Sequence, residues 1–178
     1  MLNHIKGGLK VFTDYLVSLL LFLIFLYPFI SLTGEGFTKW LPLFSLFIFF
    51  LMSLLIYVDM KALAHKEKRP QYTGMHPYPF KGIILGSIGI LPIGVVILIT
   101  SLITLGEFYE ILKPTIIKGV LGPVYFFIPL AGNGAAGYIL AGISVPVAAM
   151  LGYLAGHFDF ELGVKIKELK KKLPKVDK

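Results

Sequence analysis

Four apolar runs constrain this chain more than any other feature. They cover residues 15–32, 40–58, 82–105 and 135–156. About 20 consecutive apolar residues cross the hydrocarbon core of a bilayer as one helix, and a helix satisfies its own backbone hydrogen bonds in lipid. The sequence therefore predicts an all-α integral membrane protein with a four-transmembrane-helix bundle.

Composition agrees with a membrane location and narrows the chemistry. Only 15% of the residues are charged and the mean hydropathy is +0.81, whereas soluble domains have about 25% charged residues. The net charge is +7, and the basic residues lie beside the apolar runs. Anionic lipid headgroups are therefore the expected partner, not nucleic acid. The chain has no cysteine, which excludes disulfides and thiolate chemistry.

The distribution of basic residues predicts the topology. Fourteen of the 17 lysines and arginines fall in residues 1–14, 59–81 and 157–178, and cytoplasmic loops carry such an excess. We therefore expect both termini and the basic loop 59–81 in the cytoplasm. The Gly-Tyr-Leu-Ala-Gly segment at 152–156 resembles small bacterial membrane proteins, which implies a multi-pass protein of the bacterial plasma membrane but no function.

The segment before the last span is ambiguous. Residues 119–156 carry no formal charge. This stretch is barely long enough for two membrane crossings, and two crossings would leave the lysine-rich tail outside. We therefore interpret residues 106–134 as an outer loop that contains a re-entrant or interfacial segment. Pro123, Pro129 and Asn133 interrupt helix here, and they are either a pore or substrate site of a transporter or an ordinary turn.

Small side chains recur on one face of the predicted span at 135–156. Small residues let helices approach closely in lipid, and this packing drives helix association there. The face packs either inside the bundle, with Gly82 and Gly86 as partners, or against another copy or another membrane subunit. Its members are Gly137, Ala141, Ser144, Ala148, Gly152 and Gly156.

Polar residues near the predicted cytoplasmic face suggest binding more than catalysis. An anionic headgroup site is expected at Lys68, Arg69, Tyr78 and Lys81. A metal site is conceivable, but the spacing matches no known ligand pattern, so no cofactor and no catalytic residue are assigned. The candidate ligands are Asp59, His65, His76, His157 and Asp159. The basic tail, residues 157–178, has the apolar spacing of an amphipathic helix.

Three function classes follow from these features. The leading hypothesis is a non-enzymatic homo-oligomer or accessory subunit of a larger membrane complex, because we expect no ionisable residue at membrane depth. The second is a transporter or channel component for a small molecule or ion, with its site at residues 119–134. The third is a membrane-embedded enzyme that acts on lipid with cytoplasmic His and Asp residues.

Overall fold

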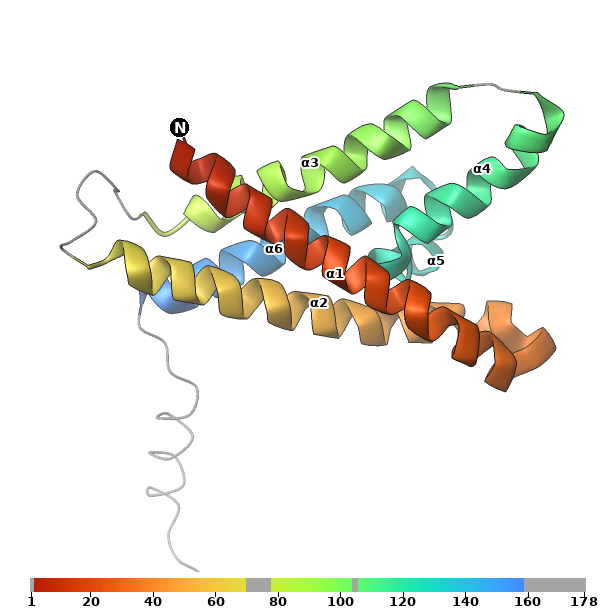
Figure 1. Cartoon of the computed structure of the whole chain (residues 1–178), viewed down its shortest axis with the longest axis horizontal. Coiled ribbons are helices and arrows are strands. Elements are labelled where there is room, and N and C mark those ends of the chain that lie inside the picture. Colours follow the sequence, from red (N-terminus) through yellow and green to blue (C-terminus); the bar gives the residue numbers. More distant parts are fainter. Residues whose placement is uncertain (1, 70–77, 104–105, 159–178) are drawn as a thin grey trace, which may run out of the picture.

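The computed structural model describes residues 2–69, 78–103 and 106–158, and this part of the chain is helical, with no strand. Figure 1 shows the helices packed in a bundle, with α4 running from beside the end of α3 back toward α1. The elements are α1 (Leu2–Thr33), η1 (Gly34–Gly36), α2 (Phe37–Glu67), α3 (Lys81–Leu102), α4 (Glu107–Val120), η2 (Gly122–Val124), α5 (Phe127–Leu130) and α6 (Ala135–His157).

Three stretches of the described chain are long and apolar enough to cross a membrane: His4–Glu67, Lys81–Leu102 and Ala135–His157. A fourth is the pair Phe108–Val120 and Gly122–Leu130, if this pair, bent by 70°, is one span. The first stretch folds back at η1 into the antiparallel helices α1 and α2 (Figure 1). The predictions of an all-α fold and of several membrane-length apolar helices are confirmed.

The first two helices are longer than the apolar runs that predicted them. α1 begins at Leu2 and α2 continues to Glu67, so both include charged residues that we had placed in a tail and a loop. At 1.5 Å per residue each helix is about 47 Å long, which exceeds a hydrocarbon core of about 30 Å. The amphipathic helix expected in the tail lies outside the described residues, apart from His157 and Phe158.

The start of α1, the end of α2, the start of α3 and the end of α6 meet at one end of the molecule (Figure 1). We call this the basic end, because the basic segments of the sequence adjoin it. The opposite end contains η1, the end of α3 and the start of α4 (Figure 1). This arrangement follows from the hairpin of α1 and α2 and from α3 and α6 running in opposite directions.

Glycines hold α6 close to three other helices. A Cβ added at Gly82 of α3 would lie 2.7 Å from the Cα of Met150, and one at Gly152 would lie 2.7 Å from the Cα of Tyr57. A Cβ at Gly137 would lie 2.7 Å from the Cα of Ile128 in α5. Real side chains do not tolerate such distances, so these backbones approach closely only because the residues are glycine.

The small-residue face of α6 is therefore used inside the bundle. All six of its predicted members are buried, and Gly86 of α3 also packs on α6, beside Pro146 and Ala149. Of the two interpretations of this face, the geometry favours packing within one chain. No self-association needs to be invoked to bury it.

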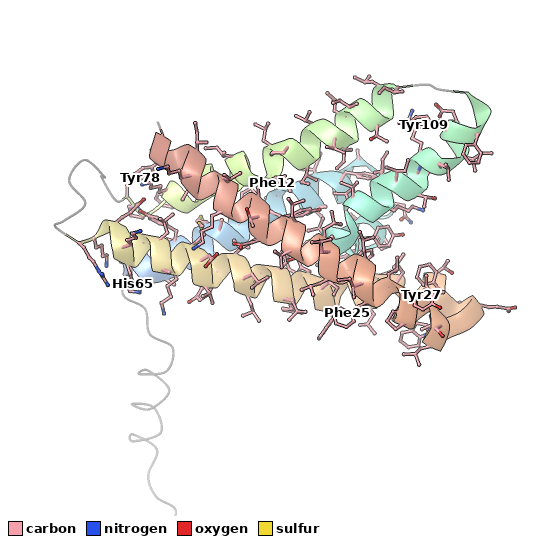
Figure 2. The ribbon with its side chains drawn as sticks, in the orientation of Figure 1. Phe12, Phe25, Tyr27, His65, Tyr78 and Tyr109 are labelled. Carbon is pink, nitrogen blue, oxygen red and sulfur yellow. The ribbon has the colours of Figure 1, made fainter. Side chains whose placement is uncertain are left out.

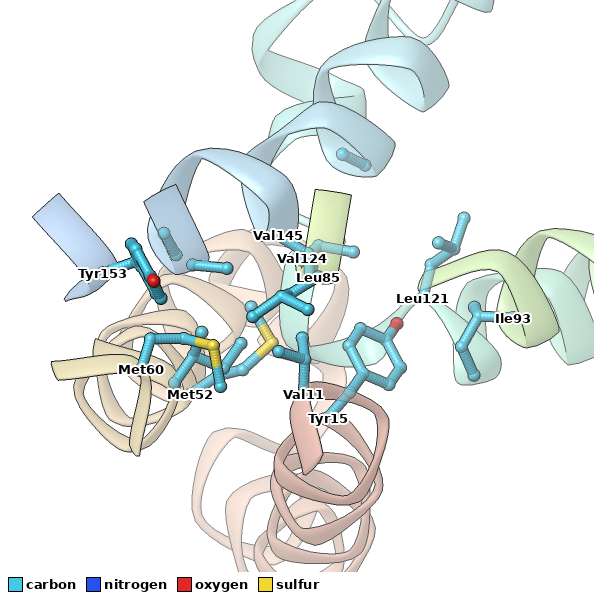
Figure 3. Close-up of a cluster of buried hydrophobic side chains, with 14 of the residues drawn as sticks. Val11, Tyr15, Met52, Met60, Leu85, Ile93, Leu121, Val124, Val145 and Tyr153 are labelled. Atoms are coloured by element: carbon cyan, nitrogen blue, oxygen red, sulfur yellow. The ribbon is translucent and has the colours of Figure 1, made fainter. Parts of the chain in front are cut away.

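The core is apolar and so is the exterior. Met52 and Met60 of α2, Val11 of α1, Leu85 of α3 and Val145 of α6 are fully buried and face one another (Figure 3). Outside the core, Leu32 is 86% exposed and Tyr27 is 81% exposed, with many other large apolar side chains around the bundle. An apolar exterior of this extent suits lipid better than water.

Replacing Gly152 by leucine should destabilise the bundle, because the new side chain would collide with the backbone of Tyr57. Overpacking costs about 1–3 kcal/mol, so we expect the unfolding midpoint in detergent, followed by circular dichroism, to fall by about 5 °C. Gly142→Leu on the same helix is the control, since a Cβ there meets no heavy atom within 4 Å. Equal midpoints for the two variants would contradict this packing.

Candidate functional site

A buried ion pair joins three helices at the basic end. The Lys81 Nζ lies 2.7 Å from Glu67 Oε1, and the Tyr153 hydroxyl donates a hydrogen bond of 2.6 Å to Glu67 Oε2. The side chains of Lys81 and Glu67 are 3% and 2% exposed, and Tyr153 is fully buried. Both carboxylate oxygens therefore have a donor inside the protein.

The fold explains how these three residues meet. Glu67 ends α2, Lys81 begins α3, and Tyr153 lies about one turn before the end of α6. Removing two charges from water costs several kcal/mol per ion, which good geometry and additional hydrogen bonds offset. The network is closed to solvent and internally satisfied, so its evident role is to fix the three helix ends relative to one another.

This network changes the interpretation of the predicted headgroup site. Lys81 is buried and binds Glu67, whereas Lys68 and Arg69 are exposed. Tyr78 is partly exposed and lies at the basic end (Figure 2). The four residues therefore do not form one surface cluster. Sequence reasoning missed this because Tyr153, which completes the site, lies 86 residues from Glu67. One signal in the sequence could have indicated the site, because Glu67 is the single acid among the basic residues from Lys61 to Arg69.

A second charged cluster lies between α1 and α2. The Lys10 Nζ is 3.0 Å from Asp59 Oδ1, and the Asp14 carboxyl group lies beside that of Asp59. Asp14 is 9% exposed, and its Oδ2 has no hydrogen-bond partner among the described residues. Asp14, Glu67 and Lys81 are thus buried inside the protein, whereas the expectation that no ionisable residue lies at membrane depth stays a prediction.

The candidate metal ligands are not assembled in the described chain. Asp59 pairs with Lys10 instead, and no group of three His, Asp or Glu residues in residues 2–69, 78–103 and 106–158 could hold a metal ion. His65 lies on α2 and His157 ends α6, where its ring stacks on Tyr153 at a centroid distance of 6.4 Å. His76 and Asp159 lie outside the described residues.

The break between α4 and α5 is stabilised by side chains from α1 and α2. The Tyr15 hydroxyl donates to the Val120 carbonyl at 2.9 Å. The Ser45 hydroxyl donates to the Gly122 carbonyl at 2.7 Å and accepts from the Phe126 N–H at 3.0 Å. Tyr15 and Ser45 are fully buried. Groups freed by a helix break inside an apolar bundle need such partners, because no water is available there.

The three residues proposed as a pore or substrate site lie in different surroundings. Pro123 is buried in η2, Pro129 is partly exposed in α5, and Asn133 is exposed in the turn before α6. Asn133 has φ 58°, follows Gly132 with φ 77°, and donates its N–H to the Ile128 carbonyl at 2.9 Å. Asparagine and glycine both tolerate this left-handed conformation, which is typical of a turn.

A groove of about 510 Å³ lies on the outside of the bundle between α2 and α6. We call it the α2/α6 groove. Its walls are apolar except for two serines and a tyrosine, and the Ser53 hydroxyl has no hydrogen-bond partner in the described chain. The residues that define it here are Phe49, Leu54, Tyr57, Phe127, Val147 and Leu151.

Replacing Lys81 by methionine should strongly destabilise the protein, because it leaves the Glu67 charge buried without its cation. Breaking a buried pair in this way costs about 3–5 kcal/mol, measurable by denaturant unfolding in detergent. The control is Lys113→Met, since Lys113 pairs with the exposed Glu110 at 3.5 Å and such pairs contribute about 0–1 kcal/mol. The double variant Glu67→Gln/Lys81→Met should be more stable than Lys81→Met alone, and purely additive losses would argue against the pair.

Replacing Ser45 by alanine should loosen the helix break. The Phe126 N–H would lose its partner, at a cost of about 1–3 kcal/mol for a buried group, and the Gly122 carbonyl would keep only the bond of 3.3 Å from the Tyr125 N–H. Hydrogen exchange at the Phe126 amide should accelerate. Thr100→Ala is the control, because the Thr100 hydroxyl is exposed and donates only within its own helix, to Val96. Unchanged exchange in Ser45→Ala would show that the hydroxyl does not hold the break.

Comparison with known proteins leaves the function to be argued from this geometry. No protein-family model, curated protein or solved structure matches the chain. The buried polar groups, the packing of the bundle and its exterior hollows are therefore the observations on which a function must rest.

Proposed function

We propose that this chain is a non-enzymatic integral membrane protein that serves as an accessory subunit of a larger membrane complex. Its apolar exterior and its membrane-length helices support insertion in a bilayer. The basic segments support a topology in which the basic end faces the cytoplasm. Such a protein acts through its outer surface and not through a path across its interior.

The observation that carries this proposal is the closed helix break. In a carrier, a broken helix presents free backbone groups to a substrate or ion. Here the Val120 and Gly122 carbonyls already accept hydrogen bonds from Tyr15 and Ser45. The ring of Phe22 covers Gly122, where an added Cβ would collide with it. This filling of residues 120–126 argues against a substrate site at the break.

The buried charges lead to the same conclusion. Glu67, Lys81 and Tyr153 satisfy one another at the basic end, and the middle of the bundle is filled by apolar side chains such as Ile48, Met52 and Val145. A proton or ion path needs a chain of polar groups across the membrane. Between the ends, Ser18 and Ser144 are buried beside these apolar side chains, and their hydroxyls donate to carbonyls of their own helices, Asp14 and Ala141.

Use of the small-residue face within one chain favours an accessory subunit over a homo-oligomer. That face was the strongest sequence signal for self-association, and α2, α3 and α5 now cover it. Contacts with another protein would then involve exposed apolar residues instead. α4 offers such a surface, with Phe108 and Ile111 about three-quarters exposed on an arm that diverges from α3 (Figure 1).

Reconstitution of the purified chain alone in liposomes tests this proposal. We expect no selective, saturable flux of ions or small solutes, and we expect the tagged protein in mildly solubilised native membranes to migrate in a complex much larger than the purified chain. Phe108→Ser/Ile111→Ser should shift the tagged protein toward the size of the isolated chain. Leu32→Ser/Tyr27→Ser is the control, since these residues are equally exposed at another site.

Saturable flux by the isolated chain would overturn the proposal and restore the transporter hypothesis. A single size for the native and purified forms would also contradict it, because an accessory subunit must have a partner. Reaction turnover on a lipid substrate by the purified chain would instead support the enzyme hypothesis.

A further inference from the structure

The charged cluster between α1 and α2 holds an unbalanced negative charge. Asp14 and Asp59 lie side by side, and the Lys10 Nζ lies 3.0 Å from Asp59 Oδ1. With both carboxyl groups ionised, two negative charges face one positive charge. A charge enclosed among apolar helices is stable only with a partner. We call Lys10, Asp14 and Asp59 the acid cluster.

The unsatisfied member of the acid cluster is Asp14. It is 9% exposed, and its Oδ2 atom has no hydrogen-bond partner in the described chain. The helix that packs on this part of α1 is α3, and it brings an apolar side chain, because Ile88 lies against Gly8. Buried polar atoms are normally bonded. The acid cluster therefore has capacity left for a cation.

A hollow of about 330 Å³ opens beside the acid cluster on the outside of the hairpin of α1 and α2. We call it the α1/α2 hollow. Asp59 is the polar residue in its otherwise aliphatic lining, and the Asp59 side chain is 31% exposed. Asp14 does not line the hollow but lies beside Asp59, which does. The lining residues are Leu21, Leu51, Leu54, Leu55, Val58 and Asp59.

All of these lining residues belong to the half of the bundle nearer the basic end. Leu51 lies beyond the middle of the apolar run 40–58, and Leu21 lies before the middle of the run 15–32. From Leu51 to Asp59 the hollow extends about 12 Å along α2. A transmembrane helix of a partner would extend along both halves of a core of about 30 Å. The hollow is therefore of a size for a small molecule, not for a helix.

Charge decides the class of that small molecule. A neutral lipid chain would fill the hollow but leave the acid cluster unbalanced. A hydrated inorganic cation would balance the cluster but leave the apolar walls uncovered. An organic cation with an apolar body does both. Asp59 directly follows the apolar run, so the charged head of such a molecule would lie near water and its body among the leucines.

We propose that the α1/α2 hollow binds a lipophilic organic monocation, an alkylamine or a quaternary ammonium compound. Its positive head lies beside Asp59, where it balances the charge that Asp14 adds, and its apolar body lies against Leu51 and Leu55. This inference rests on the membrane location in the proposed function but not on a protein partner. A failure of one therefore leaves the other standing.

Equilibrium binding of decyltrimethylammonium to the protein in an uncharged maltoside detergent tests the proposal, with empty micelles as the background. We expect saturable binding of one cation per chain. Asp14→Asn removes the unbalanced charge and should weaken binding by about fivefold, the effect of one partly exposed charge. Lys10→Gln leaves two unbalanced charges and should strengthen binding by a similar factor. Loss of fold in both variants could not produce these opposite effects.

Uncharged decanol is the matched ligand, and it should bind the parent and Asp14→Asn equally. Val58→Trp fills the hollow from α2 and should abolish saturable binding of the cation. Its matched control is Leu43→Trp on the same helix, because Val58 and Leu43 are 58% and 57% exposed and Leu43 does not line the hollow. Circular dichroism checks the helix content of each variant.

Equal affinity of the parent and Asp14→Asn for the cation would overturn the proposal. So would weaker binding by Lys10→Gln, or unchanged binding by Val58→Trp. A basic segment of another protein, crosslinked to the hollow in native membranes, would also overturn it, because the acid cluster would then pair with a polypeptide.

Discussion

Satisfaction of backbone hydrogen bonds inside an apolar bundle is the constraint on which this structure depends. The long helices meet it by themselves, but the break between α4 and α5 cannot, because its carbonyls leave the helical ladder. Two hydroxyl groups, from Tyr15 and Ser45, supply the missing donors and come from helices far away in sequence. The buried break therefore depends on contacts with the hairpin of α1 and α2.

Close helix packing depends on a second constraint, the absence of side chains at a few positions. In a bilayer, lipid would give no hydrophobic drive between helices, and contacts between backbones would have to supply the attraction. Gly82 and Gly152 bring α3 and α2 against α6 from two sides. This approach also brings Tyr153 within 2.6 Å of Glu67. The buried ion pair is thus a consequence of the glycine packing as much as a cause of it.

Apolar runs of membrane length were enough to predict the long helices α1, α2, α3 and α6. They did not predict α4, whose residues carry charges and were assigned to the outer loop. They could not predict the helix ends, since α1 and α2 continue through charged residues that pair across the hairpin, as Lys10 does with Asp59. They also could not predict the charged site. Glu67 and Lys81 look like loop residues in sequence, and only the position of α6 shows that they are enclosed. Local patterns contain no information about a helix that begins 54 residues after Lys81.

The distribution of polar groups indicates that the protein binds other molecules at its exterior and not in its interior. Its buried polar groups are mostly bonded to one another, and such groups hold structure but have little capacity left for a ligand. Three described groups are exceptions, because Asp14 Oδ2, the Ser53 hydroxyl and His157 Nδ1 are buried without a hydrogen-bond partner in the described chain. Ser53 lines the α2/α6 groove, which opens outward, so unused capacity for binding is found there at the outer surface of the bundle. That location favours ligands that approach from within the membrane plane over solutes that cross it.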